Sequence, residues 1–170
     1  MARQDDRQKP MDMRAVHTDG FYNPNSVTTL SGQVVIAQGT LKVTGDLAKI
    51  YVDADQQISR IVITGKPAHI QQLDDHGNLM AGDALTLDYD NVNGIATLIT
   101  QAVVRQQGRG EAHGDKLTYN TQTSEMTGSS GSDGLVHMIF LPKPKPSTAP
   151  AAGSKPAPAA STSQLPQGQP

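Results

Sequence analysis

The sequence predicts an all-β protein made of short antiparallel strands that repeat along the chain. Apolar and polar residues alternate with a period of two in several stretches, which gives each predicted strand one apolar face. Glycine-containing turns separate these stretches, and a Gly-Asp step recurs at residues 45, 82 and 114. A unit that is apolar on one face needs neighbours to cover that face, so we expect a repetitive antiparallel stack.

The clearest unit is the hairpin of residues 30–46. Gly39 is expected in its tight turn, because glycine adopts a positive φ at no steric cost. The Gly45-Asp46 step is expected to close the unit before a further strand over residues 47–52. Each strand of the hairpin has one apolar face, formed by Val34 and Ile36 and by Leu41 and Val43.

The other elements follow in chain order, each bounded by a turn or a break. Residues 53–57, 74–78 and 91–94 are polar turns, Gly65–Pro67 interrupts a strand, and a break is expected near Gln101. No stretch carries the i, i+3, i+4 pattern of a helix longer than one turn. The remaining predicted strands cover residues 11–16, 58–64, 68–73, 79–83, 85–89, 95–106, 114–119, 126–128 and 135–141.

Composition divides the chain into three parts. Residues 1–10 are polar and are expected to be disordered, whereas residues 11–141 carry all the predicted strands. Eight of the eleven prolines lie in residues 142–170, together with alanine, serine and glutamine. Such a segment buries too little apolar surface to offset its ordering entropy, so we expect a disordered tail.

Composition also excludes several classes of function. The formal net charge of −2 argues against a nucleic-acid-binding protein, which usually has a strong basic excess. The absence of cysteine removes disulfides, thiolate metal sites and cysteine nucleophiles. No run of about 18 apolar residues is present to span a membrane. The N-terminal residues lack the apolar segment of a signal peptide, so we expect a cytosolic protein, a mature form, or a start assigned too late.

No group of residues predicts a catalytic or metal site. Asp74 and Asp75 form a carboxylate pair but lie in a polar turn, and Ser129 and Ser130 lie in a predicted loop. We therefore expect no enzyme and no cofactor, and we interpret the histidines as solvated or structural rather than as metal ligands. The five histidines are scattered, at His17, His69, His76, His113 and His137.

Two further features leave alternatives open. The basic residues near the 105–116 hairpin either contact phosphates by charge-assisted hydrogen bonds or are simply solvated. The apolar strand faces form either a packed core or a trough that is open to lipid tails. The basic candidates are Arg105, Arg109 and Lys116, with Arg60 and Lys66 elsewhere.

The order of short motifs resembles that of the OstA-like proteins of lipopolysaccharide export. The resemblance runs from about Met11 to Leu141 and departs from the family at Thr100-Gln101, where the family repeat usually has glycine. The family also normally carries a signal peptide, which we expect to have been removed or missed here. The matching motifs are Thr29–Val43 with Gly45-Asp46, Gly65–Ala68, Gly82-Asp83 with Tyr89, and Gly114–Tyr119.

The resemblance implies a twisted, slightly open β-jellyroll of consecutive antiparallel strands that works in the periplasm. It implies a continuous apolar trough that shields lipopolysaccharide acyl chains between the two membranes. It also implies assembly end to end, and with related domains of an inner-membrane-anchored protein and an outer-membrane translocon. We expect the docking edges at residues 11–16 and 136–141, since exposed strand edges accept further strands.

Strand alternation then predicts which side chains line the trough. Methionine at the N-terminal opening suits a changing apolar partner, because its side chain is flexible. The alternatives are a structural module that joins partners by its edges without lipid, and an enzyme on a β scaffold. The resemblance adds Met11 and Met13, which match family positions at the N-terminal opening. The lining residues predicted from alternation are Val34, Ile36, Leu41, Val43, Ile50, Val52, Ile61, Ile63, Leu85, Leu87, Leu98, Val103, Leu117 and Tyr119.

Overall fold

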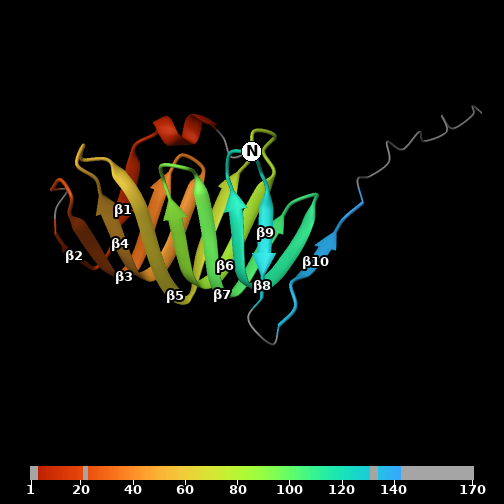
Figure 1. Cartoon of the computed structure of the whole chain (residues 1–170). Helices are drawn as coiled ribbons and strands as arrows, with labels where there is room; N and C mark the ends of the chain where they lie inside the picture. Colours follow the sequence, from red (N-terminus) through yellow and green to blue (C-terminus); the bar gives the residue numbers. More distant parts are fainter. Residues whose placement is uncertain (1–3, 21–22, 131–133, 143–170) are drawn as a thin grey trace, which may run out of the picture.

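The computed structural model describes residues 4–20, 23–130 and 134–142, and within them nearly all residues lie in one antiparallel sheet (Figure 1). The strands are paired in the order β1-β3-β4-β5-β6-β7-β8-β10, with β2 on β3 and β9 on β8. Their bounds are β1 (Met11–Arg14), β2 (His17–Asp19), β3 (Val27–Gln38), β4 (Leu41–Val52), β5 (Ile58–Leu73), β6 (Leu79–Asp90), β7 (Ile95–Gln106), β8 (Gly110–Asn120), β9 (Met126–Ser129) and β10 (His137–Phe140), after a short 3₁₀ helix η1 (Gln4–Gln8).

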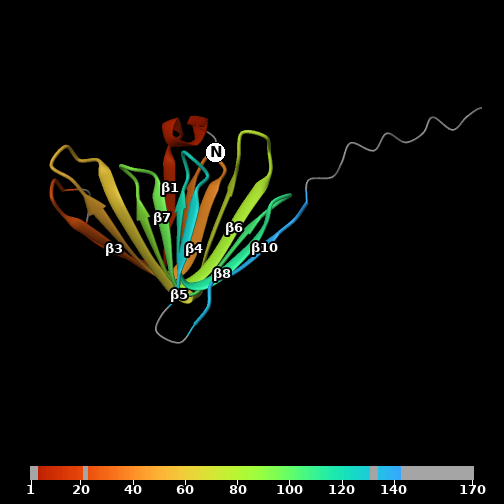
Figure 2. The same ribbon diagram turned by 45° about the vertical axis from the view of Figure 1, so that its right-hand side comes forward.

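Every long strand bends near its middle, so the sheet folds into two arms that form a V (Figure 2). The fold is the slightly open β-jellyroll that the sequence predicted. The first arm comprises β2, β9 and residues 27–31, 47–52, 58–64, 86–90, 95–99 and 116–120. The second arm comprises β1, β10 and residues 34–38, 41–45, 68–73, 79–84, 102–106 and 110–114.

The recurring Gly-Asp steps lie at these bends rather than at chain turns. We predicted that Gly45-Asp46 closes a hairpin, and this is wrong, because β4 continues from Leu41 to Val52 through a shift in register. A Cβ at Gly45 would clash with Ile63 and lie 2.8 Å from the carbonyl oxygen of Thr64. Glycine is therefore needed here because two strands approach each other closely at the apex of the V.

The break predicted near Gln101 is confirmed as a bend of β7. Its register against β8 shifts between Ile99 and Ala102, and Thr100 and Gln101 have φ angles of 66° and 54°. Positive φ is uncommon for residues other than glycine. Thr100 and Gln101 are the residues at which the chain departs from the family motif. The strand bends there although neither residue is glycine, and both have a positive φ.

The N-terminal segment is more ordered than the sequence predicted. Residues 4–8 form η1, and the side chain of Asp6 is buried, with 4% of the residue exposed. The polarity of residues 1–10 suggested disorder, but a carboxylate can be buried when donors satisfy it, and Thr40 provides them. Residues 1–3 and most of the predicted tail, 143–170, lie outside the described residues.

Turns join the strands at the open side of the V, which we call the mouth. On the second arm these turns follow β3, β5 and β7, and on the first arm they follow β4, β6 and β8. In the part of the chain that the structure describes, no helix has the length and apolarity to cross a membrane.

The turn after β6 is held by Asp90 and gives a pH-dependent prediction. The Asp90 carboxylate accepts hydrogen bonds from the side chain of Asn93 (2.7 Å) and the amides of Asn93 (3.0 Å) and Val92 (2.9 Å). The Asn93 side chain, then these amides, hold the pKa of Asp90 below its ordinary value. Stability from a lowered pKa is present above the unfolded-state pKa and is lost as pH falls through the folded-state pKa.

We therefore expect Asp90→Asn to lower the free energy of unfolding at pH 6. The difference from the wild type should shrink progressively below about pH 4. Urea unfolding of both proteins across this range measures the difference. Asp75→Asn is the matched control, since the Asp75 carboxylate has no hydrogen-bond or ion-pair partner among the described residues. A constant difference between pH 6 and pH 2.5 would contradict the assignment.

Candidate functional site

The two arms face each other through one apolar surface. Both arms contribute to it, since Ile36 and Ile70 of the second arm and Ile63 and Leu87 of the first line the same small cavity. Of the predicted lining residues, those on alternating inward positions are buried. These are Val34, Ile36, Leu41, Val43, Ile50, Val52, Ile61, Ile63, Leu87, Leu98, Leu117 and Tyr119.

On the second arm, small inward residues lie near the bends and larger ones nearer the mouth, whereas on the first arm Ile63, Leu87 and Leu98 lie next to the bends. Ala48, Ala68, Ala84 and Ala102 are buried directly beside register shifts, where the arms converge. A Cβ at Gly82 would lie 2.7 Å from a methyl group of Leu98. The side chains of the second arm thus follow the taper of the V, and in the middle of the stack the arms pack without a large internal void.

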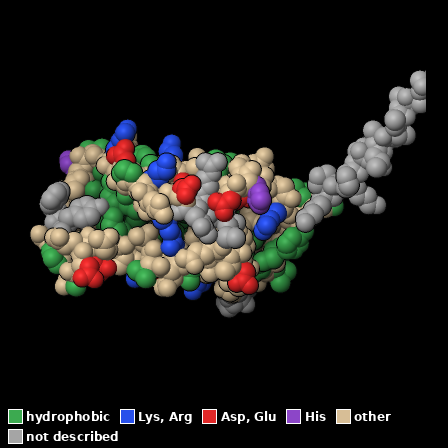
Figure 3. All heavy atoms as spheres, turned by 90° about the horizontal axis from the view of Figure 1, so that it is seen from above, with side chains coloured by type: hydrophobic (Ala, Val, Ile, Leu, Met, Phe, Trp, Pro, Cys, Tyr) green, Lys and Arg blue, Asp and Glu red, His purple; other side chains and the backbone are tan. Residues whose placement is uncertain are grey.

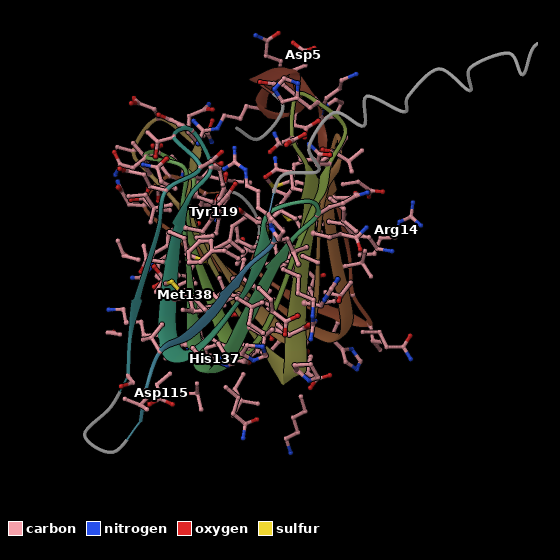
Figure 4. All side chains as sticks on the ribbon, turned by 90° about the vertical axis from the view of Figure 1, so that its right-hand side faces the viewer. Asp5, Arg14, Asp115, Tyr119, His137 and Met138 are labelled. Atoms are coloured by element: carbon pink, nitrogen blue, oxygen red, sulfur yellow. The ribbon has the colours of Figure 1, made fainter. Side chains whose placement is uncertain are left out.

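Packing differs between the middle of the stack and its C-terminal end. The cavity in the middle has a volume of only about 20 Å³. At the C-terminal end, a cavity of about 330 Å³ lies between the turn after β7, the turn after β8, and β10. Met126, Met138 and Phe140 contribute apolar walls and Arg109 a cation. In Figure 4 the side chains of Tyr119 and Met138 lie between the ribbons, and Arg14 points outward.

Two predicted lining residues are wrong. Leu85 lies in the bend of β6, where the register shifts between Asp83 and Thr86, and Ala84 takes the buried position. Val103 is on the opposite face from Ala102 and Val104, because inward positions keep the same parity through the bend of β7. Continuing the alternation of Leu98 through the bend would have selected Val104 instead.

Strand alternation also missed inward residues that the structure buries. Ile70 and Met80 are buried on the second arm and Leu30 on the first. Ile70 could have been found by continuing the alternation of Ile61 and Ile63 past Pro67 with a shift of one residue. Met80 and Leu30 fit the same periodicity once the strands are extended to their observed ends.

Methionines occupy both ends of the interior. Met11 and Met13 lie on β1 and pair with Gln38 and Ile36 of β3, and both are half-buried against the core. At the other end, Met126 and Met138 pack against the core in the same way. Because thioether side chains adapt to irregular apolar surfaces, both ends suit a variable apolar contact.

The predicted basic cluster does not form as a unit. Arg105 donates to Asp83 (3.4 Å) and Glu111 (3.3 Å) on the outer face of the second arm. The guanidinium of Arg60 forms an ion pair with Asp88 and donates hydrogen bonds to its carboxylate. These hydrogen bonds raise the pKa of Arg60 above its ordinary value. Lys66 and Lys116 lie exposed at the bends of β5 and β8, away from the mouth. Of the five candidates, Arg109 alone lines the apolar end cavity.

The histidines lie outside the apolar interior. The Nδ1 atom of His69 lies 2.7 Å from Asp83 Oδ1, and the Nε2 atom of His113 contacts Glu111 Oε1. The rings of His113 and His137 stack with centroids 6.1 Å apart. Among residues 4–20, 23–130 and 134–142, no group of three or more His, Asp or Glu side chains is placed to hold a metal ion.

Residues 15–125 match the family described as "LptA/(LptD N-terminal domain) LPS transport protein". The chain belongs to this family. Membership confirms the predicted OstA-like resemblance, and the matched range contains the bends of all six long strands.

Named relatives in this family are similar to the chain over most of its length. The lipopolysaccharide export system protein LptA of Escherichia coli strain K12 is 28% identical over 118 residues, which cover 69% of this chain and 63% of that protein. LptH of Pseudomonas aeruginosa is 28% identical over 148 residues, covering 82% of this chain and 83% of that protein. The chain thus spans less than two thirds of the length of E. coli LptA.

A solved structure has the same fold. The crystal structure of LptH from Pseudomonas aeruginosa, described as a periplasmic component of the lipopolysaccharide transport device, superposes with a TM-score of 0.72 at 25% identity. The match covers 81% of this chain and 99% of the LptH chain.

Proposed function

We propose that the chain is a non-catalytic periplasmic carrier that holds the acyl chains of lipopolysaccharide between its two arms. The observation that carries this proposal is the apolar interior that both arms share, widened at the C-terminal end into a cavity of about 330 Å³ beside Arg109. Family membership supports the choice of lipid.

The physical requirement for such a carrier is shielding of the acyl chains from water. Each methylene buried contributes about 0.8 kcal/mol, so a lipid with several acyl chains does not cross an aqueous compartment unaided. In the middle of the stack the inward side chains pack against one another. The two arms contact each other through side chains and are joined by the backbone only at the bends. Lipid therefore enters when the arms move apart.

The chain ends support assembly end to end. Within the described residues, β1 pairs only with β3, and β10 only with β8, so each leaves one edge for another strand. Ile139 and Phe140 expose apolar side chains beside the C-terminal edge. We propose that the partners are further copies, and related β-jellyroll domains anchored in the inner membrane and in an outer-membrane translocon.

One observation favours a second candidate function. The central cavity of about 20 Å³ is too small for an acyl chain, as expected for a structural module that joins partners by its edges without lipid. Titrating the purified protein with lipopolysaccharide against a fluorescent apolar dye separates the two. The carrier predicts saturable displacement of the dye, whereas the structural module predicts none.

Assembly gives a separate prediction. Phe140→Asp is expected to raise the dissociation constant for self-association by roughly tenfold or more, because it places a charge on an apolar contact surface. Phe140 is 77% exposed, so the fold should persist. Sedimentation across protein concentrations measures the change. Val92→Asp, which alters a side chain exposed to 65% in the turn after β6, should assemble as the wild type does. Equal association of both variants would contradict docking at β10.

A further inference from the structure

Residues 4–9 lie across the mouth of the groove, between the two arms. In Figure 2 the red coil of η1 lies above the V, between its spread arms. Seen from above, charged side chains gather near the middle of the mouth, and apolar ones show toward its ends (Figure 3). We call residues 4–9 the strap.

Asp6 fixes the strap to the second arm. Its carboxylate accepts hydrogen bonds from the Thr40 amide (2.9 Å), the Thr40 hydroxyl and the Gln72 side-chain amide (3.3 Å). Both Asp6 and Gln72 are buried. The side-chain amide of Gln38 also donates to the carbonyl oxygens of Arg7 (3.3 Å) and Lys9 (3.0 Å).

Arg7 reaches the first arm. Its guanidinium lies against Gly94 in the turn after β6, where a Cβ would clash with it and would lie 2.8 Å from the hydroxyl oxygen of Thr121. Gly94 is also joined to the turn after β8, because its carbonyl oxygen accepts hydrogen bonds from Thr121. The strap therefore bridges both arms across the opening through which lipid would enter.

The donors that hold Asp6 form an anion site at the rim of an apolar groove. A phosphate oxygen has the same acceptor character as a carboxylate oxygen, so an anionic head group fits the same donors. The Oε1 atom of Gln72 is buried without a hydrogen-bond partner among the described residues. It is an acceptor available to a hydroxyl or amide group of the same ligand.

We propose that the strap is displaceable, and that the anionic head group of an acylated lipid replaces the Asp6 carboxylate at Thr40 and Gln72. This proposal rests on the proposed function and adds an entry step to it. Asp6 then competes with the ligand for the donors of Thr40 and Gln72. In the free protein the Asp6 carboxylate occupies the position of the lipid's anionic group, and the strap covers the groove.

The first test follows the strap directly. Spin labels at Asp5→Cys and Val92→Cys report its distance from the first arm, since both side chains are exposed and the sequence has no cysteine (Asp5 is labelled in Figure 4). Dilauroyl phosphatidic acid should lengthen and broaden this distance. Dilauroylglycerol, which has the same chains and no phosphate, and inorganic phosphate alone should leave it unchanged. A distance unaffected by bound phosphatidic acid would overturn the proposal.

The second test uses affinity. Asp6→Ala removes the competing carboxylate, so phosphatidic acid should bind about tenfold more tightly than to the wild type. Asp5→Ala removes the same charge from an exposed neighbour and should bind as the wild type does. Equal affinities of the two variants would overturn the proposal, and if Asp6→Ala does not fold, the spin-label result decides. Absence of lipid binding in every variant contradicts the proposed function, whereas lipid binding with an unmoved strap contradicts this inference alone.

Discussion

Replacing Leu98 with alanine is expected to lower the free energy of unfolding by about 2–5 kcal/mol, because it removes a buried side chain where the surroundings relax little. Leu98 is 1% exposed and pairs with Leu87 on one side and Leu117 on the other, both inward and buried. Its methyl group also fills the space above Gly82. Urea unfolding at pH 7 measures the change.

The control for Leu98→Ala is Val92→Ala, which truncates an exposed side chain on the same arm. We expect it to change stability by less than about 0.5 kcal/mol. If Leu98→Ala were equally mild, the inward faces of the two arms would not form a packed core.

Replacing Met138 with aspartate is expected to weaken lipopolysaccharide binding by roughly tenfold or more. Met138 is half-buried and lines the end cavity, where a carboxylate would meet acyl chains instead of water. Because the residue is partly exposed, the charge can reach solvent in the free protein and the fold should persist. Dye displacement by lipopolysaccharide measures the affinity.

Two matched variants define the cause of this effect. Met138→Leu keeps an apolar side chain and should bind as the wild type does. Thr127→Asp introduces the same charge on β9, at an exposed position that faces outward, next to inward-facing Met126. Weakening by Thr127→Asp as strong as that by Met138→Asp would point to general repulsion of an anionic lipid rather than to occupancy of the cavity.

Much of the fold could be predicted because a period of two is read directly from the residues. Alternation placed Val34, Ile36, Ile61 and Ile63 on buried positions, since no bend separates the members of each pair. It failed at Val103, because the prediction did not carry the alternation of Leu98 through the bend, where the even positions of Ala102 and Val104 stay buried.

The strap could not be predicted from local sequence at all. Residues 4–9 are polar, and polarity alone indicates solvent exposure. Asp6 is buried because Thr40 and Gln72, which are distant in sequence, supply donors at one place on the rim. The recurring Gly-Asp steps carried a correct signal of repetition, but glycine accommodates a turn and a close strand approach equally well.

Photo-crosslinking along the groove tests the central claim most directly. A photoreactive amino acid is placed at inward positions near the two ends, Met13 and Met126, and at their outward neighbours, Arg14 and Thr127. The account predicts lipopolysaccharide adducts at Met13 and Met126, and none at Arg14 or Thr127. Adducts at all four positions, or at the outward pair alone, would contradict a lipid held between the arms.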